Sequence, residues 1–175
     1  MQFARMAAVV MALCGFCVPG AAADVTAKDL QVLSRALGFV QLPATASKIA
    51  IVYNPADTAS VRSAEAARRL MGDSFKAGLR TLTVMLVSLS ELDTLQDVAV
   101  LFAAADLGPD VAKVAAASQA SKAPCVTDDL ELVKRATCAI GVRTSPKVQI
   151  MVNKALTAAA GLTLDPAFKM LITEV

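Results

Sequence analysis

The residue types that most often carry out chemistry in proteins are scarce in this 175-residue chain. It contains no histidine and no tryptophan, and its four cysteines are Cys14, Cys17, Cys125 and Cys138. Histidine is the commonest general acid or base near neutral pH, and histidine and cysteine together supply most zinc sites. The composition therefore predicts a protein that is not an enzyme and that uses no metal or other cofactor.

One adjacent carboxylate pair, Asp128-Asp129, stands before a predicted helix over residues 130–136. Neighbouring positions at a helix start do not face each other, whereas acidic side chains there accept hydrogen bonds from free backbone amides. The chain also lacks a glycine-rich phosphate loop and a nucleophile elbow. We therefore interpret the pair as helix caps rather than as a general acid and base.

The first 23 residues have the pattern of a cleavable export signal. Arg5 precedes an apolar run from Met6 to Val18, which Pro19-Gly20 and three alanines separate from Asp24. This run is shorter than the roughly 20 residues that span a bilayer. We predict cleavage after Ala23, which leaves residues 24–175 as one periplasmic domain that does not insert directly into the membrane.

Cleavage at this point would leave two cysteines, Cys125 and Cys138. In an oxidising compartment two nearby thiols usually pair, although two unpaired buried cysteines are the alternative. The short helix predicted between them would return the chain beside itself, bringing two neighbouring strands to similar heights. We therefore predict a Cys125–Cys138 disulfide.

Charge argues against nucleic acid as a partner. Of the 17 basic residues only Arg5 falls in the predicted signal, so the exported domain has 16 basic residues against 15 acidic ones, a net charge of +1. No basic run or aromatic stacking platform accompanies them.

Strand-like and helix-like segments alternate after a first amphipathic helix over residues 25–40. Four such alternations indicate parallel strands joined by crossover helices. The sequence thus predicts an α/β fold, a single three-layer domain whose mostly parallel sheet has five or six strands and helices on both faces. The expected strands are 48–53, 79–87, 97–102, 124–127, 137–142 and 148–152; the expected helical segments are 58–76 (closed by Gly78), 90–96, 109–121, 130–136, 153–161 and a short one from 165.

Short polar side chains follow the carboxyl ends of the predicted strands. In an open parallel sheet, ligands bind beyond these ends, where the connections diverge. Such side chains suit a small polar solute, and each is also an ordinary turn or cap residue. The candidate ligand-binding residues are Asn54, Asp57, Thr58, Ser60, Asp106, Thr127 and Asp128, with Ser88 and Ser90 after the second strand.

Two segments resemble the YfiR-type periplasmic proteins. The first segment is Arg35-Ala-Leu-Gly-Phe-Val-Gln-Leu-Pro43, followed by the predicted strand 48–53. The second segment begins at Cys125-Val-Thr-Asp-Asp-Leu130 and continues through Cys138-Ala-Ile-Gly-Val142 to residues 148–162 and the last predicted helix. The resemblance implies a regulatory protein that restrains a membrane-bound diguanylate cyclase through the cyclase's periplasmic domain. Family members also carry disulfides and commonly have aromatic residues, including tryptophan, where this chain has Gln41-Leu42.

A second resemblance is to one lobe of a periplasmic substrate-binding protein of an ABC importer. It rests on Ile49-Ala-Ile-Val-Tyr-Asn-Pro55, Pro124-Cys-Val-Thr-Asp-Asp129 and Ala139-Ile-Gly-Val142. Such proteins clamp a ligand between two lobes, and 152 residues supply one. Either the lobe has become an interaction module, or it binds its solute at the interface of a homodimer.

These observations lead us to expect a non-enzymatic periplasmic protein that acts by contact with the periplasmic domain of an inner-membrane protein. The alternative is a small-solute-binding component that serves the permease of a transporter.

Overall fold

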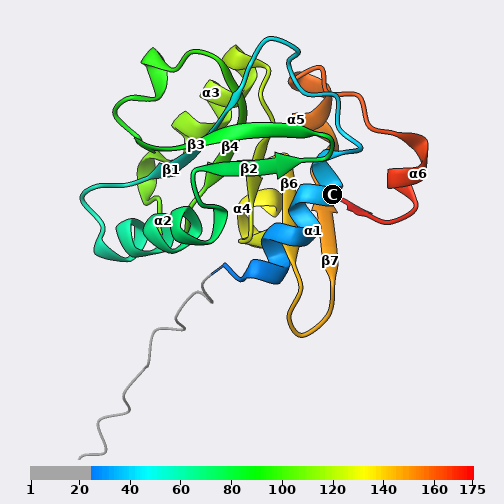
Figure 1. Ribbon diagram of the computed structural model, residues 1–175, viewed down its shortest axis with the longest axis horizontal. Coiled ribbons are helices and arrows are strands. Elements are labelled where there is room, and N and C mark those ends of the chain that lie inside the picture. The colour runs from blue at the N-terminus through cyan, green and yellow to red at the C-terminus, as the bar shows by residue number, and fades with distance from the viewer. Residues whose placement is uncertain (1–24) are drawn as a thin grey trace, which may run out of the picture.

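The structure is a computed structural model that describes residues 25–175 (Figure 1). The predicted export signal lies outside the described residues. Eight strands form one sheet in the order β2-β3-β1-β4-β5-β6-β7-β8. The strands are β1 (Lys48–Tyr53), β2 (Ser74–Ala77), β3 (Arg80–Ser88), β4 (Val98–Ala103), β5 (Cys125–Thr127), β6 (Ile140–Arg143), β7 (Gln149–Val152) and β8 (Thr173–Glu174).

The centre of the sheet is parallel, as the alternation of strands and helices predicts. Strand β1 pairs with β3 on one side and β4 on the other, and β4, β5 and β6 continue in the same direction. Antiparallel pairing occurs between β2 and β3 and between β6 and β7. The predicted α/β class with a mostly parallel sheet is confirmed, and the sheet is larger than expected by two short strands, β2 and β8.

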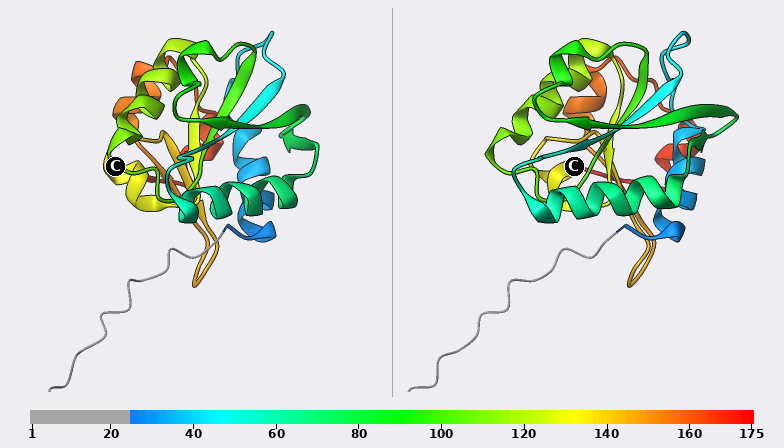
Figure 2. Two further views of the ribbon diagram at one scale, coloured as in Figure 1. Left: turned by 90° about the vertical axis from the view of Figure 1, so that its left-hand side faces the viewer. Right: turned by 60° about the vertical axis from the view of Figure 1, so that its left-hand side comes forward.

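Helices cover both faces of the sheet, which gives the predicted three layers (Figure 2). Alternate residues of β1 enter two different apolar clusters. Ile49 and Ile51 pack with residues of the helices at 27–37 and 58–71, whereas Ala50 and Val52 pack with residues of the helices at 112–121 and 130–134. Such a strand is buried on both faces, which is why it reads as a continuous apolar run. The helices are α1 (Ala27–Leu37), α2 (Thr58–Met71), α3 (Ala112–Ser121), α4 (Leu130–Lys134), α5 (Lys154–Ala159) and α6 (Pro166–Lys169), with 3-10 turns at Leu92–Thr94 and Pro109–Val111.

The helix predicted over residues 58–76 ends five residues early. After Met71 the chain turns at Gly72, whose φ is +70°, and residues 74–77 then alternate between exposed and buried. That alternation is the period of a strand, and Ser74–Ala77 forms a hairpin with β3. Gly78 therefore does not close a helix: it lies in the hairpin turn with a φ of +62°.

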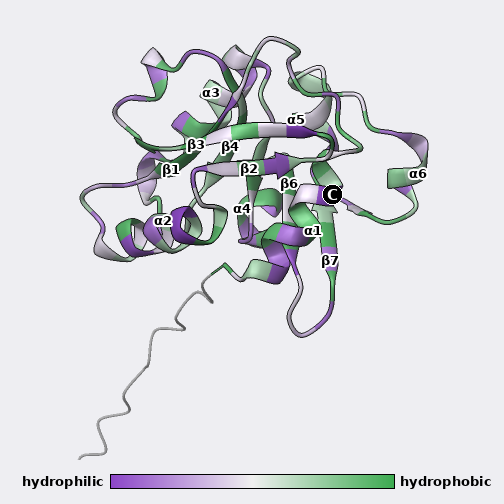
Figure 3. Cartoon of the chain, viewed as in Figure 1, coloured by the Kyte–Doolittle hydropathy of each residue, from purple (hydrophilic) through white to green (hydrophobic). Residues whose placement is uncertain are grey.

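None of the helices within residues 25–175 is long and apolar enough to cross a membrane. The apolar residues instead concentrate in the central strands and on the inner sides of the helices (Figure 3).

Candidate functional site

The predicted ligand-binding residues lie where the parallel strands β1, β3, β4 and β5 end, so the structure places them along one edge of the sheet. We call this the carboxyl edge. Direct contacts join the loops that carry them. The Asn54 side-chain amide donates to the carbonyl oxygen of Leu107 at 3.4 Å, and the Thr127 hydroxyl donates to that of Ala103 at 3.1 Å.

The turn after β1 uses most of its polar groups internally. The backbone N–H of Asn54 donates to the hydroxyl of the fully buried Ser60 at 3.0 Å. Asp57 caps α2, since its Oδ1 accepts from the backbone N–H groups of Ala59 and Ser60 at 2.7 and 3.1 Å. Asn54, Asp57 and Ser60 therefore fix the shape of this turn and leave few groups free for a ligand.

Thr58 and Asp106 differ from these three residues because their side chains are exposed. Thr58 is the first residue of α2, and Asp106 lies in the loop after β4 with a φ of +54°. This loop approaches the β1 turn closely: a Cβ added to Gly108 would lie 3.3 Å from the side-chain nitrogen of Asn54. Both side chains are available at the carboxyl edge.

The loop after β5 contains a buried carboxyl group with unmet hydrogen-bonding capacity. Asp128 is 6% exposed, and among residues 25–175 its Oδ1 is the buried side-chain atom that has no hydrogen-bond partner. Burial raises the pKa of this carboxyl to about 6, and the charges of Asp29 and Asp129 act in the same direction. The nearby Arg143 opposes this shift, while its guanidinium donates to the backbone oxygen of Asp128 at 2.8 and 3.1 Å.

Asp129 behaves as the sequence predicts, and Asp128 does not. The Asp129 carboxylate caps α4 by accepting from the N–H of Glu131 at 2.9 Å, and its own N–H donates to Thr127 at 3.0 Å. The Asp128 side chain caps none of the helices within residues 25–175. Of the adjacent pair, Asp128 is therefore the group that remains unexplained by helix capping.

Two residues beside Asp128 were not singled out from the sequence. Arg143 ends β6, and Asp29 lies in the first turn of α1. Although burial alone would raise the pKa of Asp29, hydrogen bonds from Thr26 and Thr144 hold it below its usual value. The Thr26-x-x-Asp29 capping-box spacing was the available signal for Asp29. Nothing in the sequence pattern pairs it with Thr144, whose N–H donates to it at 2.7 Å.

Ser88 and Ser90 form a separate small cluster after β3. Their hydroxyl oxygens are 2.8 Å apart, and Ser88 also donates to Glu91 through its hydroxyl at 2.8 Å and its backbone N–H at 3.0 Å. These bonds lower the pKa of Glu91. The cluster closes the turn that leads to the 3-10 segment Leu92–Thr94.

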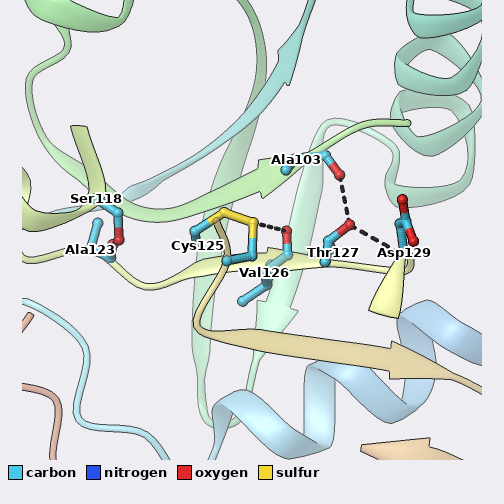
Figure 4. The surroundings of a disulfide bond; sticks show 8 residues. Ala103, Ser118, Ala123, Cys125, Val126, Thr127 and Asp129 are labelled. Carbon is cyan, nitrogen blue, oxygen red and sulfur yellow. Dashed lines mark hydrogen bonds between the residues drawn. A yellow bond between two sulfur atoms is a disulfide. The ribbon is translucent and has the colours of Figure 1, made fainter. Parts of the chain in front are cut away.

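The predicted disulfide between Cys125 and Cys138 is present (Figure 4). Both residues are fully buried, and their Cα atoms are 4.6 Å apart. Cys138 precedes β6 rather than lying inside it, because that strand begins at Ile140 instead of the predicted residue 137. The bridge holds the start of β5 against the segment that enters β6, and β5 ends at the carboxyl edge.

The sequence matches no family model, and no curated protein matches it. Solved structures do match. A conserved domain protein from Vibrio cholerae has a TM-score of 0.60 at 13% identity, and the match covers 85% of this chain and 59% of that one. The ABC domain of Streptococcus pneumonia in complex with L-Trp has a TM-score of 0.57 at 13% identity, with the same coverage of both chains.

A third match is the ligand-free, open structure of CD0873, a substrate binding protein with adhesive properties from Clostridium difficile. Its TM-score is 0.54 at 15% identity, and the match covers 85% of this chain and 58% of that one. These matches concern the fold: the α/β domain of this chain is similar to part of each of these three structures. This chain spans less than two thirds of the length of each of these three structures. They support the second resemblance, whereas the likeness to YfiR-type proteins stays a prediction.

Proposed function

We propose that this protein is a non-enzymatic solute-binding protein of the periplasm, which binds a small polar solute at the carboxyl edge and serves a membrane transporter. The observation that carries the proposal is the buried Oδ1 of Asp128, which has no hydrogen-bond partner among the described residues and lies at the edge where ligands bind in open parallel sheets. If the loop after β5 moves to expose this oxygen, an N–H or O–H group of a solute would satisfy it and offset the cost of burying it.

The exposed Thr58 hydroxyl and Asp106 carboxylate lie at the same edge as Asp128 and would supply further contacts. Three carboxylates, those of Asp106, Asp128 and Asp129, lie in the loops after β4 and β5, and the cation that acts on Asp128 is Arg143 at the end of β6. This balance favours a solute that carries hydrogen-bond donors or a positive charge over an anionic one. The fold likeness to a protein described as bound to L-Trp makes amino acids the first solutes to test.

Calorimetric titration of the exported protein with amino acids and aromatic acids tests this function. Saturable binding that Asp128→Asn weakens at least about tenfold supports it, since a hydrogen bond to a charged group contributes about 1.5–3 kcal/mol. Asp93→Asn serves as the control, because Asp93 is an exposed carboxylate of the 3-10 segment Leu92–Thr94. Equal loss in both variants would argue against a specific role for Asp128.

A second candidate function is contact with the periplasmic domain of an inner-membrane protein, such as a diguanylate cyclase. One observation favours it: Asn54, Asp57, Ser60 and Thr127 are bonded within the protein itself. Because these polar side chains form hydrogen bonds within the protein, the carboxyl edge would be suited to act as a rigid contact surface. Failure of all solutes to bind, together with co-purification of such a membrane protein, would favour this candidate.

A further inference from the structure

Exposed apolar side chains gather at the end of the molecule where β3 begins, opposite the carboxyl edge of the sheet. Leu79 lies in the turn before β3 and is completely exposed, Met170 and Leu171 follow α6 with 88% and 63% exposure, and Phe39 follows α1 with 36%. We call these four residues the apolar tip. Scattered exposed apolar residues are ordinary, whereas a group of them marks an interaction site.

A backbone contact and a ring stack link the three segments of the apolar tip. The backbones of Gly38 and Gly78 touch, since a Cβ on Gly78 would lie 2.4 Å from the Cα of Gly38. Phe39 and Leu79 thus each follow one of two glycines whose backbones are in contact. The Phe39 ring stacks on the buried Phe168 with centroids 5.4 Å apart, which ties the end of α1 to α6. In Figure 1 the hairpin turn, the end of α1 and α6 all lie toward the right-hand side of the molecule.

The charged residues around the apolar tip are mainly basic. Arg35 lies in the last turn of α1, Lys76 in the hairpin beside the turn, and Lys169 at the end of α6, and all three are exposed. None of the ion pairs formed within residues 25–175 involves any of them. The acidic neighbours are Asp165, which caps α6, and Glu174, which lies near Lys169 and pairs with Lys154. The surface therefore complements a negatively charged partner.

The shape of the apolar tip favours a lipid surface over a folded protein. Its most exposed side chains stand on a turn and on the end of a short helix, so they project outward rather than line a groove. A fluid bilayer accepts separate projecting side chains, and anionic head groups attract lysine and arginine near the surface. We propose that the apolar tip docks the protein peripherally on an anionic membrane, with the carboxyl edge facing away from it.

Sedimentation with lipid vesicles tests the proposal on the exported protein. We expect binding to vesicles that contain phosphatidylglycerol, and about tenfold weaker binding for Leu79→Ser, because one leucine side chain no longer enters the interface. Lys76→Gln and Lys169→Gln should each weaken binding about fivefold and reduce its dependence on salt. Leu70→Ser is the matched control, since Leu70 is a 47% exposed leucine on α2.

Three outcomes would overturn the proposal. The first is equal sedimentation with phosphatidylcholine and phosphatidylglycerol vesicles, and the second is equal weakening by Leu79→Ser and Leu70→Ser. The third is a concentration-dependent dimer that Leu79→Ser dissociates, which would assign the apolar tip to a second copy of the chain. All substituted residues are exposed, so an unchanged melting temperature verifies that each variant is folded.

Discussion

Replacing Asp128 by asparagine should change the free energy of unfolding more favourably near neutral pH than at acidic pH. The pKa of the Asp128 carboxyl is about 6 in the folded protein, whereas an ordinary aspartate has a pKa of about 3.8. Below about 3.8 the group is protonated in both folded and unfolded chains and costs nothing. As the pH rises from about 3.8 to about 6, the unfolded chain releases this proton first, so the free energy of unfolding falls, and above about 6 the loss is constant.

The size of this loss follows from the shift of the pKa. A difference of about two units, at about 1.4 kcal/mol per unit, gives about 3 kcal/mol. Asparagine carries no charge and so removes this pH dependence, but its amide still needs partners in the buried site, which adds a cost of its own. That cost is the same at both pH values. The quantity to measure is therefore the effect of the substitution near neutral pH minus its effect at acidic pH.

Urea unfolding at about pH 4 and about pH 7.5 provides both effects by linear extrapolation. Part of this loss has already occurred at about pH 4, because the unfolded chain is partly ionised there. We therefore expect the free energy of unfolding of Asp128→Asn, relative to the unsubstituted protein, to rise by about 2.5 kcal/mol between the two pH values. The exposed Asp93→Asn should show almost no such change. Asp29, whose pKa is held below its usual value, titrates below this range, and it is present in both proteins. A difference near zero for Asp128→Asn would refute the reasoning that burial dominates the ionisation of this carboxyl.

Three further changes test the packing around the site, each by urea unfolding. Replacing Cys125 and Cys138 together by alanine should lower the free energy of unfolding by about 3 kcal/mol, because the bridge closes a loop with a sequence separation of 13; free thiols in the exported protein would contradict this. Asp57→Ala should cost about 1 kcal/mol by removing the cap of α2, whereas Thr58→Ala at the next position should cost much less. Gly141→Ala should cost about 1–3 kcal/mol, because its Cβ would lie 2.6 Å from the Cγ2 of Val133 on α4, and an unchanged stability would mean that α4 packs less closely on β6.

The sequence was sufficient for the central architecture because that part of the chain is dominated by one physical signal. Strands β1 and β4 are buried on both faces and stand out as continuous apolar runs between amphipathic helices. The cysteine pair was predictable for a related reason, since a short crossover helix leaves few places for the second strand to lie.

The hairpin of β2 shows where this reasoning stops. Phe75 continues the apolar spacing of α2, and a four-residue segment is too short for its period to be decided by pattern. The glycines at 72 and 78, both at positive φ, are what separate the strand from the helix. Strand β8 has only two residues, Thr173 and Glu174, and its pairing with β7 depends on the path of the chain after α6.

The candidate site was predicted in position but not in role. Strand ends identified the carboxyl edge, yet whether Asn54 or Ser60 is free depends on loop conformations that residue type does not determine. Asp128 gains its properties from burial next to Arg143 and from the neighbouring Asp29. Asp29 reaches this place through a bond to Thr144, 115 residues away in the sequence. A contact between residues so far apart in the sequence leaves no local sequence pattern from which it could be predicted.

The most direct test of the proposed function is a calorimetric titration of the exported protein and its Asp128→Asn variant with one panel of amino acids, beginning with L-tryptophan. We predict saturable one-to-one binding of at least one member of the panel, weakened about tenfold or more in the variant because Asp128 accepts a hydrogen bond from the solute. Equal affinity in the two proteins, or an absence of binding across the panel, would contradict the assignment of the carboxyl edge as a solute site.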